Sequence, residues 1–396
     1  MSTPAARPPG ADDPGQAIAA ARKARGLTQS ELARQAAISL SLLRKIERGS
    51  RTLTLGVRTA LDAVLAPVPA SDDSAAAPER IAAALPQLRE VMDAYDILPD
   101  LPCPTRPLTE LRRLTSSATA WRLSSQYAKL AGLVPGLITD LTATALNSAG
   151  HEQEQAFGLL ALAYRAADAI ADKHGRHDMS GRATELIRWA AARSADPQLE
   201  MMSTYVRAEL FFFGQHARSG LRMIDSVTPP PPPASDVPLL ATRGALCMRA
   251  AVLAARSGMP DEAADRIAEA QAIARQVPDG VYHGTAFGPG SVRVHELALA
   301  VETGDIGRAV KLAGQWQPPR VLPAERRSHF FIEAARAYCW AGNRDQAVTA
   351  LWQARCAAPQ HTRCNPAVIE TIGVLIRGGR QPPPSLIQLA TWIGHP

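Results

Sequence analysis

Apolar residues along most of this chain recur at intervals of three and four positions, the period of an amphipathic helix rather than of a strand. Alanine and leucine dominate, while β-branched and aromatic residues are sparse, and this composition also favours helices. Residues 79–98 are a clear example, although we expect Pro86 to interrupt them. We predict an all-α protein, with helices at 16–25, 29–36, 40–48, 55–65, 79–98, 109–131 and 135–148, followed by pairs of helices from about residue 155.

Three segments interrupt the helical pattern and indicate where domains begin and end. Residues 66–78 form a Pro/Ser/Asp/Ala linker, residues 228–238 contain five consecutive prolines, and residues 279–291 are rich in glycine. At 396 residues the chain is too long for one ordinary core. We predict a disordered lead-in at 1–14, a small domain at 15–66, a linker at 67–78 and a helical-repeat domain at 79–396.

The helix pairs of the second domain repeat a common arrangement of small residues. In the clearest pair, at 331–359, Gly342 ends the first helix and Pro359 closes the second. Small residues let two antiparallel helices approach closely, and Tyr338 and Leu351 fill the gap. Repeats of about 34 residues with this pattern predict a tetratricopeptide-like α-solenoid, with a generic helical solenoid as the alternative. The same frame recurs at Ala251, Gly258, Ala263, Ile267 and Ala270 and at Leu297, Gly304, Ala309 and Ala313.

Residues 27–49 are typical of two short helices joined by a tight turn. Gly26 suits the end of a preceding helix, and Thr28 with Glu31 forms a capping box that starts the next. Ser39 caps the following helix, and Gly49 ends it. The expected core consists of Leu27, Leu32, Ile38, Leu43 and Ile46, with Val57, Leu61 and Val64 from a fourth helix.

All of the excess positive charge lies in this small N-terminal domain. Residues 15–66 carry nine Lys or Arg against three acids, a net charge of +6. The whole chain has 43 basic and 37 acidic residues, so the remainder is balanced at 34 of each. A polyanion such as DNA would bind to a basic module of this kind.

The segments LTQSELA and KIERG resemble the lambda-repressor-like, or XRE-type, helix-turn-helix family over about 50 residues. The resemblance implies that the helix after Ser39 lies in the major groove of double-stranded DNA. It also implies a structural salt bridge between Arg22 and Glu47. Leu40 departs from the polar residue usual at its position and could contact a thymine methyl group. Base edges would be read by Leu40, Ser41, Arg44 and Lys45, and phosphates held by Gln29, Ser39, Arg48, Ser50 and Arg51.

Segments at 93–114, 159–175, 285–305 and 322–348 resemble actinobacterial XRE regulators with a tetratricopeptide-like C-terminal domain. This resemblance implies a cytosolic, homodimeric transcription factor whose helical domain senses a small-molecule or peptide effector or dimerises. Peptide-sensing regulators of similar build use Asn side chains, but this chain has only three Asn. We expect instead a concave pocket for an anionic or polar ligand, lined by Arg165, Tyr205, Arg249, Arg293 and His295.

Other chemistry lacks a sequence signature. GTAFGPG (284–290) has no Lys-Ser/Thr of a P-loop and is not expected to follow a strand, and the chain contains neither HExxH nor GxSxG. We therefore expect no enzyme activity, no cofactor and no metal site.

The expected location is the cytoplasm, without a membrane partner. No apolar run approaches the ~18 residues that span a bilayer, the N-terminus has no secretory pattern, and the five cysteines show no CxxC spacing. Two other functions remain open at this point. The repeat groove could make the chain a protein-interaction adaptor, or the chain could be an antitoxin-like autoregulator.

Overall fold

The computed structural model describes residues 15, 18–19, 22, 28–36, 38–51, 57, 60–61, 64, 76–100, 105–212, 216–228, 236–378 and 381–394. Within these residues the regular structure is helical apart from one two-stranded hairpin, which confirms the all-α prediction. The predicted lead-in at 1–14, most of the linker at 67–78 and the proline run at 229–233 lie outside the described residues, as do Leu27 and most of 16–25 and 55–65.

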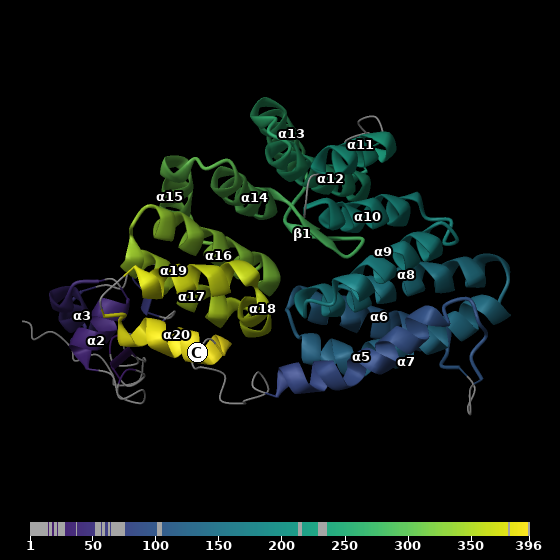
Figure 1. The fold of residues 1–396 in the computed structure, drawn as a ribbon, viewed down its shortest axis with the longest axis horizontal. Coiled ribbons are helices and arrows are strands. Elements are labelled where there is room, and N and C mark those ends of the chain that lie inside the picture. The colour runs from purple at the N-terminus through teal and green to yellow at the C-terminus, as the bar shows by residue number, and fades with distance from the viewer. Residues whose placement is uncertain are drawn as a thin grey trace, which may run out of the picture.

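The elements carry the labels of Figure 1. Their bounds, in chain order, are α2 (Gln29–Gln35), α3 (Leu40–Glu47), α5 (Ala77–Asp93), α6 (Leu108–Leu123), α7 (Tyr127–Asn147), α8 (Gly150–Lys173), α9 (His177–Ala191), α10 (Pro197–Arg207), the 3₁₀ helix η2 (Ala208–Phe212), α11 (Ala217–Val227), α12 (Val237–Arg256), α13 (Pro260–Ala274), β1 (Gly280–Tyr282), β2 (Thr285–Phe287), α14 (Pro289–Glu302), α15 (Ile306–Gln315), α16 (Ala324–Trp340), α17 (Arg344–Ala357), α18 (Pro359–Cys364), α19 (Pro366–Arg377) and α20 (Pro384–Ile393).

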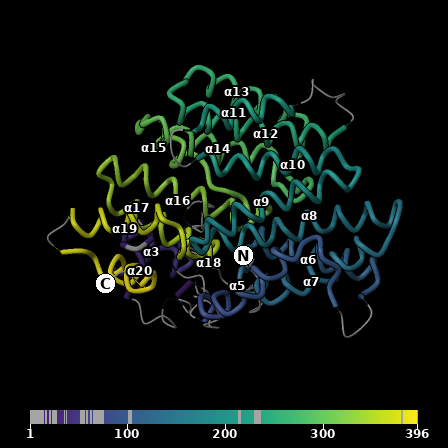
Figure 2. The backbone as a smooth tube through the Cα atoms, turned by 45° about the vertical axis from the view of Figure 1, so that its right-hand side comes forward, coloured from purple at the N-terminus to yellow at the C-terminus, as the bar shows by residue number. Residues whose placement is uncertain are grey.

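Successive helices of the larger domain pack as pairs that stack into an arch (Figure 1). The most extensive pairings are α8 with α9, α12 with α13 and α16 with α17. The first helices of successive pairs also contact one another, from α10 through α12 and α14 to α16. These helices form the inner layer of the arch, and their partners lie outside them, as the turned view of Figure 2 also shows.

The two limbs of the arch meet on its inner side. The backbone N–H of Ala128, in α7, donates to Oε1 of Gln360, in α18, at 3.1 Å. α6 also contacts α16. Segments more than 200 residues apart in the sequence therefore enclose a common interior, since Ala128 and Gln360 are separated by 232 positions.

One type of turn ends the first helix of each clear pair. Gly342 adopts a φ of 78°, and the N–H of Asn343 reaches back to the carbonyl of Tyr338 at 2.8 Å. This is a Schellman turn, which needs a left-handed residue. The same N–H to carbonyl bond closes α3, α6, α8, α12, α14 and α16, with the left-handed residue at Gly49, Ser125, Gly175, Gly258, Gly304 and Gly342 respectively.

Two of the predicted helix boundaries were wrong. α5 continues through Pro86, because Ile81 and Leu88, on either side of the proline, are both buried in one core. The expected helix over 109–131 is broken at Ser125, which takes a φ of 57°, and α7 then runs through Pro135. Tertiary packing overrides the local preference at both prolines.

The Gly-rich segment forms a hairpin rather than a loop. β1 and β2 pair antiparallel, with Val281 opposite Ala286, so GTAFGPG does follow a strand, contrary to our expectation. The ring of Phe287 is fully buried and lies so close to Gly244 of α12 that a Cβ there would overlap it. Because Gly244 has no Cβ, the hairpin can pack directly against α12 of the inner layer.

The described apolar side chains form three cores. One spans α5 to α14, a second spans α14 to α20, and α14 contributes to both, through Val292 and Leu297 respectively. The third belongs to the N-terminal domain and contains Leu32, Leu43, Ile46 and Leu61. The predicted core residues Ile38, Val57 and Val64 are partly buried against it.

Two helices are long and apolar enough, by length and composition, to cross a membrane, which we had not expected from the sequence. They are α7 and α12, and most of their apolar residues are buried against other helices of the arch. Core helices of this kind pass the same test, so the finding is weak evidence for a membrane span.

Candidate functional site

Local hydrogen bonds set the ends of α2 and α3. The Thr28 hydroxyl accepts from the N–H of Glu31 at 3.2 Å, and the Glu31 carboxylate accepts from the N–H of Thr28 at 2.7 Å. Hydrogen bonds from Thr28 lower the pKa of Glu31. Ser39 caps α3 by accepting from the N–H of Leu42 at 3.2 Å. The capping box and the second cap predicted from the sequence are both present.

The predicted salt bridge ties the first segment of the domain to the end of α3. Nε and Nη2 of Arg22 donate to the two carboxylate oxygens of Glu47 at 2.7 and 3.0 Å. The side chains of Arg22 and Glu47 are only 10% and 6% exposed, so neither can reach a ligand on the surface. This hydrogen-bonded pairing raises the pKa of Arg22. The pair therefore fixes the orientation of α3.

Gln29 joins the same network. Its side-chain amide donates to Oε2 of Glu47 at 2.7 Å. We had placed this side chain among the phosphate-holding groups. In the structure its amide also links the start of α2 to the end of α3, an arrangement that residue spacing does not reveal, and its contact with phosphate stays a prediction.

One exposed face of α3 carries four of the predicted DNA-contacting side chains. Ser41, Arg44, Lys45 and Arg48 are spaced by three, one and three positions, which places them on the same side of a helix. All four are exposed. The opposite face buries Leu43 and Ile46 in the domain core, so the cationic face points outward.

The remaining predicted contacts surround this face. Ser39 and Arg51 are exposed at its two ends. The hydroxyl of Ser50 donates to the carbonyl of Lys45 at 2.9 Å, so it helps to end α3. Leu40 is half-buried and packs against the domain core, so only part of its side chain is available to a base.

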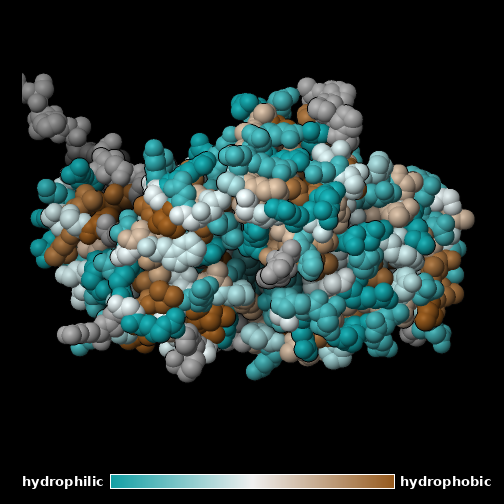
Figure 3. Space-filling model, turned by 45° about the horizontal axis from the view of Figure 1, so that its top comes forward, coloured by the Kyte–Doolittle hydropathy of each residue, from teal (hydrophilic) through white to brown (hydrophobic). Residues whose placement is uncertain are grey.

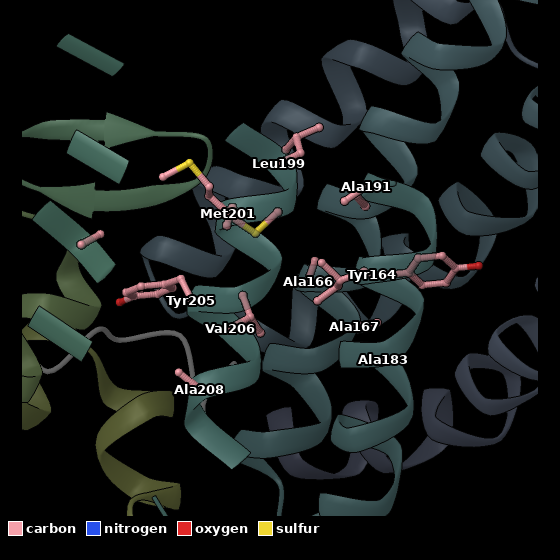
Figure 4. Packing of buried hydrophobic residues seen from close by; sticks show 14 of the residues in the cluster. Tyr164, Ala166, Ala167, Ala183, Ala191, Leu199, Met201, Tyr205, Val206 and Ala208 are labelled. Atoms are coloured by element: carbon pink, nitrogen blue, oxygen red, sulfur yellow. The ribbon is translucent and has the colours of Figure 1, made fainter. Parts of the chain in front are cut away.

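Three of the five predicted ligand-contacting residues come together on the inner side of the arch. The Tyr205 ring lies 4.2 Å from the guanidinium carbon of Arg249 and 5.6 Å from that of Arg165. Arg165 donates from Nη1 to the carbonyl of His283 at 3.1 Å and to the hydroxyl of Thr285 at 2.8 Å. Figure 4 shows Tyr205 pointing away from Tyr164 and the packed alanines, toward the C-terminal half of the chain.

The other two predicted residues lie on different sides of α14, because they are two positions apart in that helix. His295 is buried, donates from Nδ1 to the carbonyl of Ser291 at 2.9 Å, and has its pKa lowered well below the usual range by burial and by Arg326. Arg293 is exposed and lies over the Trp316 ring at 5.6 Å. Of this pair, only His295 belongs to the interior.

Several charged residues of the interior were not predicted from the sequence. Nη2 of Arg326 donates to the Tyr205 hydroxyl at 2.8 Å, and Glu209 forms an ion pair with Arg249. Arg122 donates to the carbonyl of Gly284 at the tip of the hairpin. These side chains come from α16, η2 and α6, and nothing in their local sequence distinguishes them from a solvated helix face.

Comparison with known proteins identifies one part of the chain. Residues 18–66 match the family model described as helix-turn-helix. No curated protein and no solved structure matches the chain. The match supports a DNA-binding transcription regulator of the XRE type, and it covers the domain in which Arg22, Glu47 and the exposed face of α3 were found.

Proposed function

We propose that this protein is a sequence-specific DNA-binding transcription regulator that inserts α3 into the major groove. The observation that carries the proposal is the exposed face of Ser41, Arg44, Lys45 and Arg48, backed by the buried salt bridge of Glu47. In a helix-turn-helix the second helix of the motif reads base edges. A helix of two turns held at its end by Arg22 and Gln29 presents those side chains in a fixed orientation.

The arch has the role of a sensing or dimerising domain in this proposal. Its charge density is low, since residues 79–396 carry 33 basic and 30 acidic residues, a net of +3, against +6 in the 52 residues of 15–66. DNA attraction therefore belongs to the N-terminal domain, and the helical pairs are left to bind an effector or a second copy. A homodimer in the cytoplasm would place two α3 helices on half-sites about one helical turn apart.

Selection of binding sites from a random duplex library tests the proposal. The wild-type chain is expected to enrich a defined sequence. Arg44→Ala should relax the preference at one base position, at a cost of about 1–3 kcal/mol, if Arg44 reads a base. Arg218→Ala is the matched control, because Arg218 is an exposed arginine of α11, in the arch. Failure of the wild type to enrich any sequence would overturn the proposal.

A further inference from the structure

Four inner helices of the arch each contribute a side chain to one charged cluster. Arg165 comes from α8, Tyr205 from α10, Arg249 from α12 and Arg326 from α16. The three guanidinium groups surround the Tyr205 ring and hydroxyl, two over the ring and one hydrogen-bonded to the oxygen. Cations are normally kept apart in a protein interior, so this convergence requires a compensating charge.

The described carboxylates of the interior do not supply enough negative charge. Five cationic side chains and three carboxylates lie close enough in the interior to interact electrostatically. This set of eight groups therefore has two positive charges in excess. A fourth carboxyl, Asp168, has its pKa raised to about 7 by burial and by Glu209, so near neutral pH it is only partly ionised and does not remove the excess. The cations are Arg122, Arg165, Lys173, Arg249 and Arg326, and the carboxylates are Asp172, Glu209 and Glu325.

The histidines beside the cluster do not change this balance. Burial, together with Arg326, lowers the pKa of His329 to about 3. Burial, together with Lys173, lowers the pKa of His361 to about 4. Both rings are therefore neutral at physiological pH and add no charge of their own.

Hydrogen-bond donors in the cluster also lack acceptors. The Nε atoms of Arg249 and Arg326 are buried, and neither has a hydrogen-bond partner among the described residues. Arg165 donates to a backbone carbonyl and a hydroxyl, not to a carboxylate. Burying such donors without acceptors is costly, and an anion would satisfy them.

Part of the cluster remains accessible to solvent. Burial is the largest influence on the pKa values of Glu325, Arg326 and His329, yet each of these residues is only half-buried. Figure 3 shows the face of the molecule hollowed near its middle. A separate cavity of about 390 Å³ shares Glu209 but has Asp168 and Asp172 on its wall, so an anion belongs at the guanidinium groups instead.

We propose that the inner side of the arch binds a small dianion, held by Arg165, Arg249 and Arg326 around Tyr205. A phosphate group and a dicarboxylate share the chemistry that these guanidinium forks recognise. A dianion would offset the positive excess of this cluster. The role of this ligand as an effector rests on the proposed function, but its binding does not, because the site contains no residue of the N-terminal domain.

Calorimetric titration and thermal unfolding of the full chain, without DNA, test the site. The probes are inorganic phosphate and succinate, with chloride at matched ionic strength as the reference. Phosphate or succinate is expected to bind and to raise the melting temperature above that in chloride. A response to phosphate alone identifies a phosphorylated ligand, and a response to succinate alone identifies a dicarboxylate.

Matched variants separate this site from the basic face of α3. Arg326→Gln should weaken binding of the responding anion about tenfold or more, since it removes a charge-assisted hydrogen bond. Arg293→Gln, on the exposed side of α14, and Arg44→Gln, on α3, should bind it as the wild type does. If Arg326→Gln does not fold, Arg326→Lys replaces it, and is expected to weaken binding several-fold because the ammonium has no planar fork.

Three results would overturn the proposal. They are the absence of any anion response in the wild type, an unchanged affinity in the Arg326 variant, and a loss of affinity in Arg44→Gln. Because no DNA is present, none of them bears on whether α3 reads a sequence.

Discussion

At the scale of single residues, the N-terminal domain separates side chains that hold the frame from side chains that face outward. Arg22, Gln29 and Glu47 form one nearly buried network. Arg44 and Lys45, in the same helix as Glu47, are exposed on the surface. Charge alone does not separate the structural residues Arg22 and Glu47 from the outward-facing Arg44 and Lys45, but the burial of the first pair does.

Loss of Glu47 should loosen the domain. Glu47→Ala leaves Arg22 nearly buried without its carboxylate, which costs about 3 kcal/mol or more. Amide hydrogen exchange should show protection of α2 and α3 falling about a hundredfold. Glu31→Ala is the control, since it removes an exposed capping box worth about 1 kcal/mol. Equal effects of the two substitutions would contradict the structural role of Glu47.

A buried carboxyl in the arch gives a pH dependence with a definite sign. The pKa of Asp168 is raised to about 7 by burial and by Glu209, so the folded chain holds a proton that the unfolded chain has lost above pH 4. Stability from this group is therefore lost as the pH rises from about 4 to about 7, by at most ~1.4 kcal/mol per pH unit.

Asp168→Asn removes that dependence, because asparagine stays neutral and can still accept from the Ser180 hydroxyl. The free energy of unfolding in urea should therefore rise in the variant relative to the wild type between pH 4 and pH 7. A difference between the two proteins that stays constant with pH would show that Asp168 is ionised in the folded chain throughout.

At the scale of elements, the Schellman turn sets where the paired helices end. Five of the turns use glycine, but the turn after α6 places Ser125 in the left-handed region, with a φ of 57°. A side chain in that region costs about 1–2 kcal/mol relative to right-handed backbone, and glycine avoids the cost.

Substitutions at two turns should have opposite signs. Ser125→Gly is expected to raise the free energy of unfolding by about 0.5–1 kcal/mol. Gly342→Ala should lower it by about 1 kcal/mol through backbone strain alone, because a Cβ at Gly342 would meet nothing within 4 Å. Chemical denaturation of both variants checks this, and destabilisation by Ser125→Gly would count against a strained turn.

The hairpin depends on close contact between β2 and α12. A methyl group at Gly244 would overlap the buried ring of Phe287. Gly244→Ala should therefore cost about 1–3 kcal/mol by overpacking, more than Gly342→Ala, and should increase amide exchange in β1 and β2. Unchanged exchange in the hairpin would show that Phe287 relocates without disturbing the strands.

The sequence predicted those elements whose signals are local. Glycine at the C-terminal end of a helix predicted the turns at Gly258, Gly304 and Gly342, and the capping box predicted the start of α2. Ser125 gave no such signal, so the break between α6 and α7 was missed. The continuity of α5 and α7 through prolines depends on tertiary packing, which a local pattern does not contain.

At the scale of the whole molecule, the arch brings together residues that the sequence keeps far apart. Arg165 and Arg326 approach the same tyrosine from α8 and α16, which belong to opposite limbs of the arch. The sequence predicted Arg165, Tyr205 and Arg249 as neighbours, but it also included Arg293, which points outward. Arg326 could not be predicted from the sequence, because only the closure of the arch brings α16 to Tyr205 of α10. The tetratricopeptide assignment of the repeats stays a prediction.

Residues 15–66 carry a net charge of +6, and we predict that this N-terminal domain binds DNA through the exposed face of α3. Footprint titration of the full chain across a series of salt concentrations, on a site from the library selection, tests it most directly. We predict a protected site with two half-sites about one helical turn apart, and a logarithm of affinity that falls linearly with the logarithm of salt concentration, with a shallower slope for Arg44→Ala if Arg44 holds phosphate. Absence of a protected site, together with binding that does not respond to salt, would contradict it.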